Sequence, residues 1–372
     1  MAIYLDYAAA TPVDTHVQAA MQPFLANQFY NPSALYGPAV AASHALDTAR
    51  ADVAAVLGAK PSEIIFTAGG TEANNLAILG VEGEVMVSAI EHVSVRGPAN
   101  QREHQIIPVN AAGLVDADKL IIGDKVGLIS VMYANNEVGT VQPIKRISAV
   151  VETVRRERAK NGNPLPLYFH VDAAQAGNYL DMHVHRLGVD LMTINGGKLY
   201  GPKQTGALFV RSGIILKPLV HGGGQERNLR SGTENVAGAV GFAKALQISV
   251  EKRHEEARRL TDLQNRFFHL LEQAFPSLIV NGSRKHRLPN NVHITLPNTD
   301  NERVLMNLDM EDIYAAAGSA CSASHDEPSH VLQAMGVDEA SIRSSLRFSL
   351  GRDTTLADIE HVVAVLSEVS HR

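Results

Sequence analysis

The sequence has little of what several classes of protein require. A single cysteine among 372 residues excludes an internal disulfide bond and indicates a reducing compartment. No apolar run approaches the roughly 18 residues that a membrane-spanning helix needs. The first residues, 1–6, have no basic region and reach an acidic residue at once, which is not typical of a signal peptide. From these absences we expect a soluble, cytoplasmic protein that does not associate with membranes.

Positive charge in excess is also missing. The formal net charge is −6, and acidic residues interrupt or border the basic clusters at 155–158 and 252–254. Such clusters are typical of solvated helix faces, so we do not expect binding to nucleic acid. The histidines are scattered and show no ligand spacing with the one cysteine, so we expect no metal site.

What is present is the composition of an ordinary globular protein. Hydrophobic residues make up 45% and charged residues 19% of the chain, and no internal repeat or low-complexity tract is visible. A chain of 372 residues exceeds what one small core usually carries. We therefore expect one large domain with a smaller companion.

Apolar runs alternate with helical patterns in the first half of the chain. We predict strands at 64–67, 85–88, 126–131 and 167–171, with helices at 71–79 and 147–158. The runs are almost continuously apolar, as in strands that are buried on both faces. This order predicts a parallel sheet covered by helices.

The pattern changes after Val210. We expect a helix at about 234–248 and a second, long amphipathic helix at about 252–275. The segments 291–296 and 346–350 alternate like half-buried strands. We place a domain boundary near the long helix.

Two residues stand where an α/β sheet places its ligands. Asp172 ends the apolar run 167–171, and Lys198 follows another apolar stretch, 191–194, in a glycine-rich turn. An aspartate for a pyridinium nitrogen and a lysine for a Schiff base are the minimal set for pyridoxal phosphate (PLP). The alternatives are that Asp172 caps a helix and that Lys198 is an ordinary loop lysine.

A glycine-containing turn that could bind a phosphate group precedes Asp172 and Lys198 in the sequence. The strand 64–67 leads through Gly69 and Gly70 to a helix that starts near Thr71. Backbone N–H groups at a helix N-terminus bind phosphate, and the Thr71 hydroxyl could add a bond. The alternative is a plain strand-to-helix turn in which Thr71 is the N-cap.

Taken together, these segments resemble the cysteine desulfurases of the NifS/IscS type, within the fold-type I (class V aminotransferase-like) PLP enzymes. The matching segments cover nearly the whole chain: 4–12, 31–33, 71–76, 91–92, 135–139, 221–227, 230–236, 318–321 and 347–352. The resemblance implies an α/β fold, with a mostly parallel seven-stranded sheet between helices and a smaller α+β C-terminal domain. We place the large PLP-binding domain at 14–250, and the small domain at 1–13 and 251–372.

The resemblance also implies roles around the cofactor. Lys198 would hold PLP covalently and act as the proton-transfer base, while Asp172 would pair with the ring nitrogen. Gln175 would bond to the phenolic oxygen, and His92 would stack on the ring and assist proton transfer. The residues implied to surround the phosphate are Thr71, Gly70, Asn195 and, from a second subunit, Thr233. This last role implies a homodimer with shared active sites.

The implied substrate is L-cysteine, whose carboxylate Asn136 and Arg347 would hold. The implied product is L-alanine, together with a persulfide on Cys321. The sulfur would pass to an acceptor protein, which could be an iron–sulfur scaffold or a tRNA-thiolation relay. The alternatives are a related PLP lyase, such as a selenocysteine lyase, and a non-catalytic sulfur-relay protein.

Cys321 lies in a run of small residues, 315–324. A lone cysteine is usually buried as a small hydrophobe, but this run offers little apolar mass to hold it in a core. We therefore expect the thiol on a loop at about 315–330, where it attacks the substrate sulfur as a thiolate. A role as an acyl nucleophile is the rival, but no His–Asn pattern lies near it.

Two features depart from the family pattern. Asn195-Gly196-Gly197 precedes Lys198 where Ser-Gly-His is usual, and Gln204-Thr205 replaces small or apolar residues. We expect weaker PLP retention or a rearranged phosphate site. The chain also ends soon after a helix expected at about 356–367, so docking of a scaffold through the usual tail is not expected.

Overall fold

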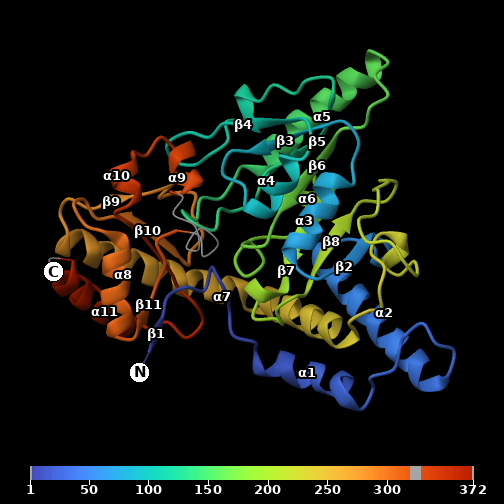
Figure 1. The fold of residues 1–372 in the computed structure, drawn as a ribbon, viewed down its shortest axis with the longest axis horizontal. Coiled ribbons are helices and arrows are strands. Elements are labelled where there is room, and N and C mark those ends of the chain that lie inside the picture. The colour runs from blue at the N-terminus through green and yellow to red at the C-terminus, as the bar shows by residue number, and fades with distance from the viewer. Residues whose placement is uncertain (1, 319–327, 371–372) are drawn as a thin grey trace.

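A seven-stranded sheet forms the centre of the computed structural model, which describes residues 2–318 and 328–370 (Figure 1). Its strands are, in chain order, β2 (Ile64–Thr67), β3 (Glu84–Ser88), β4 (His104–Ile107), β5 (Val126–Ser130), β6 (Tyr168–Asp172), β7 (Leu191–Asn195) and β8 (Gly206–Val210). Their order across the sheet is β2-β8-β7-β6-β5-β3-β4. All neighbours are parallel except β8, which is antiparallel to both β2 and β7.

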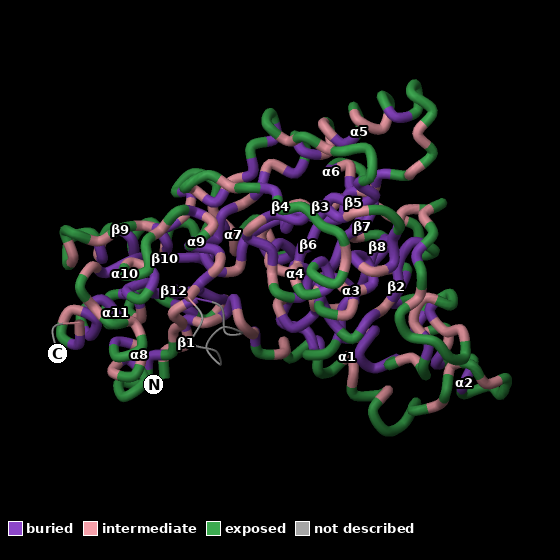
Figure 2. Tube along the Cα trace, turned by 45° about the horizontal axis from the view of Figure 1, so that its top comes forward, coloured by how far each residue is buried: buried purple, intermediate pink, exposed green. Residues whose placement is uncertain are grey.

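Helices cover both faces of this sheet. Those before and between the strands are α1 (Thr15–Ala26), α2 (Gly37–Leu57), α3 (Gly70–Leu79), α4 (Val93–Ala99), α5 (Ile144–Lys160) and α6 (Val184–Leu187). Short 3₁₀ turns are η1 (Pro61–Glu63), η2 (Ala117–Lys119), η3 (Gly196–Lys198) and η4 (Glu226–Asn228). Side chains of α2 and α5 pack on one face of the sheet, and side chains of α3 and α4 pack on the other. The predicted strands are therefore buried on both faces, as their apolar runs indicated (Figure 2).

The long helix α7 (Val236–Ala274) runs for 39 residues without a break. The prediction of two helices, at 234–248 and 252–275, was wrong. No glycine or proline lies between Ile248 and Lys252, so nothing in the sequence interrupts the backbone hydrogen bonds there. The first part of α7 packs on the large sheet, and the second part packs on a separate hydrophobic core.

That second core surrounds a smaller antiparallel sheet with the order β12-β10-β9. Its strands are β9 (Ile279–Val280), β10 (Asn291–Thr295) and β12 (Ser345–Ser349), and the separate pair β1 (Ile3–Tyr4) and β11 (Ile313–Tyr314) is parallel. The helices of this part are α8 (Asn301–Met310), α9 (His330–Ala334), α10 (Glu339–Ile342) and α11 (Leu356–Val369). The predicted α/β fold with a small C-terminal sheet is confirmed. The exact division at residue 250 stays a prediction.

The alternating strands were predicted to be half-buried, and this was wrong. All residues of β10 and β12 are buried, including the polar ones. Several of their polar side chains find partners within the fold: Asn281 contacts His293 and Thr295, and Thr295 bonds with Ser345. Among the residues described, no helix is long and apolar enough to cross a membrane.

Candidate active site

A cavity of about 240 Å³ lies at the carboxyl ends of β6 and β7. It is lined by Ala8, Ala9, Gly70, Thr71, Asn74, His92, Ser94, Met132, Ala134, Asn136, Asp172, Ala174, Gln175, Asn195, Lys198 and Arg347. The cavity thus brings together nine predicted site residues: Lys198, Asp172, Gln175, His92, Thr71, Gly70, Asn195, Asn136 and Arg347. Thr233 is exposed and does not line it. Cys321 lies outside the described residues.

Asp172 is the last residue of β6 and is buried. Its Oδ1 accepts a hydrogen bond from the backbone N–H of Ala174 (2.9 Å), and its Oδ2 accepts one from Asn74 Nδ2 (2.7 Å). The residues that follow form a turn and not a helix, so the alternative that Asp172 caps a helix was wrong. Two donors fix the carboxylate at the sheet edge, with lone pairs remaining for a ligand.

Lys198 ends the 3₁₀ turn η3, directly after β7. Its ammonium donates to the carbonyl oxygen of Ala8 (2.8 Å) and to that of Ala9. Gln175 Nε2 donates to the same Ala8 carbonyl (2.9 Å). The segment between β1 and α1 therefore positions both side chains in the cavity.

His92 is the N-cap residue of α4. Its Nδ1 accepts from the backbone N–H of Ser94 (3.1 Å) and lies 2.8 Å from Ser94 Oγ. Burial lowers the pKa of His92; nearby Asp172 acts to raise it and Lys198 to lower it, and the net pKa lies below its usual value. Burial therefore favours the neutral imidazole form of His92.

The predicted phosphate site is a helix N-terminus. Gly69 has φ +112°, a backbone conformation that side chains rarely adopt, and it turns the chain from β2 into α3 at Gly70. Asn195 Oδ1 accepts from Gly197 N–H (3.1 Å), and its Nδ2 lies 3.6 Å from where Gly70 would carry a Cβ. Amide donors of Asn195 and of the first turn of α3 thus lie side by side.

The two glycines before Lys198 differ in the space around them. A Cβ on Gly196 would lie 2.3 Å from Thr205 Oγ1, which is too close. A Cβ on Gly197 would have no neighbour nearer than 3.6 Å. Position 197 therefore has room for the start of a side chain, and position 196 does not.

Arg347 in β12 supplies a buried cation to the cavity. It donates to the carbonyl oxygen of Asn136 (3.0 Å) and pairs with Asp6 (2.5 Å). Its Nε is buried and has no hydrogen-bond partner among the described residues. An unsatisfied buried donor on a guanidinium is suited to an anionic ligand such as a carboxylate.

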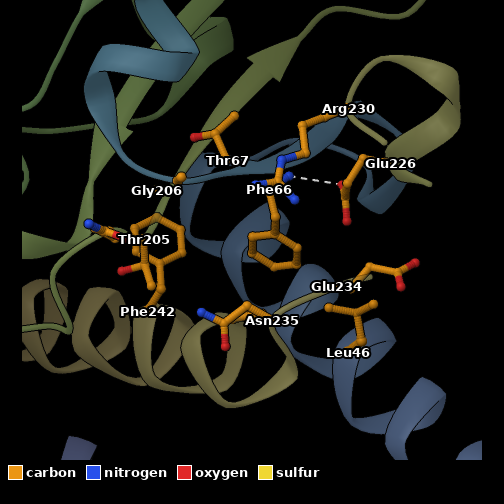
Figure 3. A pocket seen from close by; sticks show the side chains of 13 residues that line it. Leu46, Phe66, Thr67, Thr205, Gly206, Glu226, Arg230, Glu234, Asn235 and Phe242 are labelled. Atoms are coloured by element: carbon orange, nitrogen blue, oxygen red, sulfur yellow. Dashed lines mark hydrogen bonds between the residues drawn. The ribbon is translucent and has the colours of Figure 1, made fainter. Parts of the chain in front are cut away.

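Figure 3 shows a second cavity, of about 190 Å³. It lies next to the first, since Gly206 in its lining pairs with Asn195 of the first cavity across two strands. Its lining comprises Leu46, Phe66, Thr67, Ala68, Gln204, Thr205, Gly206, Glu226, Arg230, Glu234, Asn235, Ala239 and Phe242. Glu226 accepts two bonds from Arg50 (both 2.7 Å) and one from the backbone N–H of Phe66 (2.9 Å). Arg230 bonds to Glu72 (3.0 Å), and Thr205 bonds to the Pro202 carbonyl (2.6 Å).

The sequence did not reveal several polar contacts of the first cavity. Asn74 and Ser94 connect Asp172 to His92, and Asp6 pairs with Arg347. All three residues lie in or next to segments that resemble the family, but only the fold shows what they touch. The best signal in the sequence was an asparagine within the otherwise apolar face of α3.

Comparisons with known proteins agree with this geometry. The model of the family described as aminotransferase class-V matches residues 3–362. The chain is 40% identical to a protein named cysteine desulfurase IscS from Dictyoglomus turgidum, over 99% of this chain and 94% of that one. It is 41% identical to a protein of the same name from Methanosarcina thermophila, over 99% of this chain and 92% of that one.

Solved structures show the same similarity. A NifS-like protein from Rickettsia africae has a TM-score of 0.90 and 32% identity, with all of each chain covered. The structure titled SspA in complex with cysteine has a TM-score of 0.80 and 35% identity, over 94% of this chain and 98% of that one. The chain therefore belongs to the aminotransferase class-V family.

Proposed function

We propose that this protein is a PLP-dependent cysteine desulfurase, which converts L-cysteine to L-alanine and leaves the sulfur as a persulfide on Cys321. In this reaction the substrate's C–S bond breaks and an S–S bond to Cys321 forms. The thiol and the substrate together supply every atom of alanine and of the persulfide, so no external oxidant is required. The observation that carries the proposal is that Lys198, Asp172 and Arg347 converge in one cavity. Full-length similarity to proteins named cysteine desulfurase supports it.

The residues of the cavity fit PLP. Lys198 offers the amine for covalent attachment, and Asp172 is a buried carboxylate with lone pairs to spare for a ring N–H. The N-terminus of α3 and the Asn195 amide offer donors to a phosphate. When bound, PLP supplies an electron sink that acidifies the Cα–H of an amino acid.

The chain's own groups would orient the substrate. Arg347 would bind the substrate carboxylate through its Nε, which no described residue contacts by a hydrogen bond, and the side chain of Asn136, which also lines the cavity, would assist. The Ala8 and Ala9 carbonyls hold the Lys198 amine at the cavity wall, where it can carry a proton to or from the substrate carbon. Arg347 and Ala8 are buried, whereas Ala9, Asn136 and Lys198 are partly buried, so a substrate bound among them would displace water from part of the cavity.

A homodimer and a sulfur acceptor belong to the same proposal. Thr233 is exposed and directly precedes Glu234, which lines the second cavity, so it is available to a second copy of the chain. The persulfide on Cys321 would pass its outer sulfur to a thiolate of an acceptor protein, either an iron–sulfur scaffold or a tRNA-thiolation relay.

The test uses the full chain loaded with PLP and supplied with L-cysteine. We expect alanine to form, with one protein-bound persulfide per chain in the absence of a reductant. The control is Cys321→Ala, which removes the only thiol; it should keep the absorbance of bound PLP and lose the persulfide. Normal sulfide release by this variant would reject Cys321, and absence of alanine from the unaltered protein would reject the desulfurase. Faster alanine release from selenocysteine would favour the lyase.

A further inference from the structure

A chain of hydrogen bonds connects Asp172 to His92 through two residues without an assigned role. Asn74 Nδ2 donates to Asp172 Oδ2 (2.7 Å) and to Ser94 Oγ (2.8 Å). Ser94 in turn contacts His92 Nδ1 through both its hydroxyl (2.8 Å) and its backbone N–H (3.1 Å). The chain brings together β6, α3 and the start of α4, and all four residues line the first cavity.

The donor directions in this chain follow from the chemistry of its two ends. The Asp172 carboxylate only accepts, so the amide of Asn74 must turn its nitrogen toward it. The second hydrogen of that nitrogen goes to Ser94 Oγ, which leaves the Ser94 hydroxyl hydrogen for His92 Nδ1. This orientation leaves one hydrogen bond of the amide unmade, because Asn74 Oδ1 is buried without a partner among the described residues.

The backbone N–H of Ser94 can only donate. His92 Nδ1 must therefore be an acceptor, and it receives two donors, from the backbone and from the hydroxyl of the same residue. A proton on Nδ1 would face both. The start of α4 adds a partial positive charge at the same place, which further disfavours an imidazolium.

We infer that Asn74 and Ser94 are positioning residues that hold His92 neutral, with its proton on Nε2. Given the proposed function, His92 then offers the bound substrate and cofactor an N–H donor from Nε2, and it is not a base at that nitrogen. This sharpens the predicted role of His92: its Nε2–H donates a hydrogen bond and is not given up outright, because loss of that proton from the neutral ring would leave an imidazolate.

Other ionisable groups around His92 agree with this assignment. Asp172 from β6, Lys198 from η3 and His330 from α9 all act on it electrostatically. Glu91 precedes it and is fully buried; burial raises the pKa of Glu91 to about 8, so this carboxyl is mostly protonated at neutral pH. Among the described residues, Asp172 is the carboxyl group that acts to raise the pKa of His92, and the Asn74 amide holds its Oδ2.

The test is ¹⁵N NMR of the full chain labelled at histidine, recorded first without and then with PLP. The resonance of His92 is assigned by its loss in His92→Gln. We expect a pyridine-type Nδ1 and a protonated Nε2 at pH 7, in both samples. Since this readout does not require turnover, it is independent of the proposed desulfurase activity.

Two variants test the positioning residues, and a third serves as the control. Ser94→Ala removes one donor to Nδ1, and Asn74→Ala releases the Ser94 hydroxyl. Each should raise the pKa of His92 by about 0.5–1 unit, the equivalent of one net hydrogen bond. The matched control is Asn75→Ala. Asn75 is the next residue on α3, and its side chain donates to the Thr71 carbonyl and takes no part in the hydrogen bonds between Asp172 and His92. A proton on Nδ1 in the unaltered protein, or equal His92 titration in all three variants, would overturn the inference.

Discussion

The two neighbouring cavities are built from the same turns, yet their polar groups are satisfied differently. The turn between β2 and α3 and the segment between β7 and β8 contribute to both. In the second cavity Glu226 has three donors and Arg230 has a carboxylate partner, although Glu234 Oε2 has no partner in the described part of the chain. In the first, Arg347 Nε and Asn74 Oδ1 are buried and have no partner within 2–318 and 328–370. We therefore interpret the first cavity, where a buried guanidinium has a spare donor, as the binding site, and Glu226, whose carboxylate has three donors, as structural support.

The largest expected effect is the loss of the amine in the first cavity. Lys198→Ala should lower alanine formation by about 10³-fold or more, because covalent attachment of PLP and proton transfer both depend on it. The measurement is turnover together with the absorbance of bound PLP. The control is Lys203→Ala, which removes an exposed lysine of the same turn. Retained turnover in Lys198→Ala would contradict the interpretation of the first cavity, and not the second, as the site of the reaction.

The next largest effect belongs to the second cavity and to stability. Glu226→Gln leaves Arg50 buried without its carboxylate, which should cost about 3–5 kcal/mol of unfolding free energy. PLP affinity should change by less than about twofold, since Glu226 does not line the first cavity. Denaturant unfolding and PLP titration measure the two quantities. A large loss of PLP affinity with intact stability would contradict the structural role of Glu226 and indicate that the second cavity contributes to PLP binding.

Arg347 tests whether the unpaired donor serves the substrate. Arg347→Lys keeps the charge but loses Nε, so KM for cysteine should rise about 10- to 100-fold. The matched control is Arg352→Lys, because Arg352 also pairs with a carboxylate, Asp14, but does not line the cavity. Steady-state kinetics should separate the two. An equal rise in KM for both variants would argue for a general effect of packing.

Glu91 provides a pH test. Its pKa of about 8 in the folded chain exceeds the ordinary value of 4.5, so the folded state keeps a proton that the unfolded chain loses between pH 4.5 and 8. Stability should fall as pH rises through this window, and Glu91→Gln should abolish that fall. At pH 8 the variant should be more stable by about 1–3 kcal/mol, with the difference vanishing near pH 4.5.

Glu63 is the control for Glu91, with the opposite sign. Burial acts to raise its pKa, but hydrogen bonds from Lys60 and Ser212 outweigh burial and lower it. Glu63→Gln should therefore destabilise the protein at neutral pH and have less effect as the pH falls. The same direction for both variants, measured by thermal unfolding from pH 4 to 9, would contradict these pKa directions.

The smallest expected effect concerns the glycine before Lys198. Gly197→His has room for its Cβ and places an imidazole beside the phosphate site, which should tighten PLP binding about two- to fivefold. PLP titration of the apo-protein measures this. Gly196→Ala is the contrasting variant, since its Cβ would clash with Thr205 and should lower stability. An unchanged PLP affinity in Gly197→His would count against the predicted weakness of this site.

Residues that end apolar runs could be predicted from the sequence, but side-chain partners could not. Asp172 and Lys198 each follow a buried strand, and parallel strands bring their carboxyl ends together. The bond from Asn74 to Asp172 spans 98 residues and depends on how α3 packs on the sheet. The strand β10 was misjudged for the same reason, since its polar side chains find partners on distant segments.

The uninterrupted helix α7 contributes side chains to both hydrophobic cores. Phe242 and Leu246 belong to the core of the large sheet, while Phe267 and Leu271 belong to that of the small one. Because α7 is one continuous helix, we expect that unfolding of one core destabilises the part of α7 that packs in the other core. We therefore expect the two cores to unfold together, and we expect a ligand that binds between Asp172 of β6 and Arg347 of β12 to stabilise both.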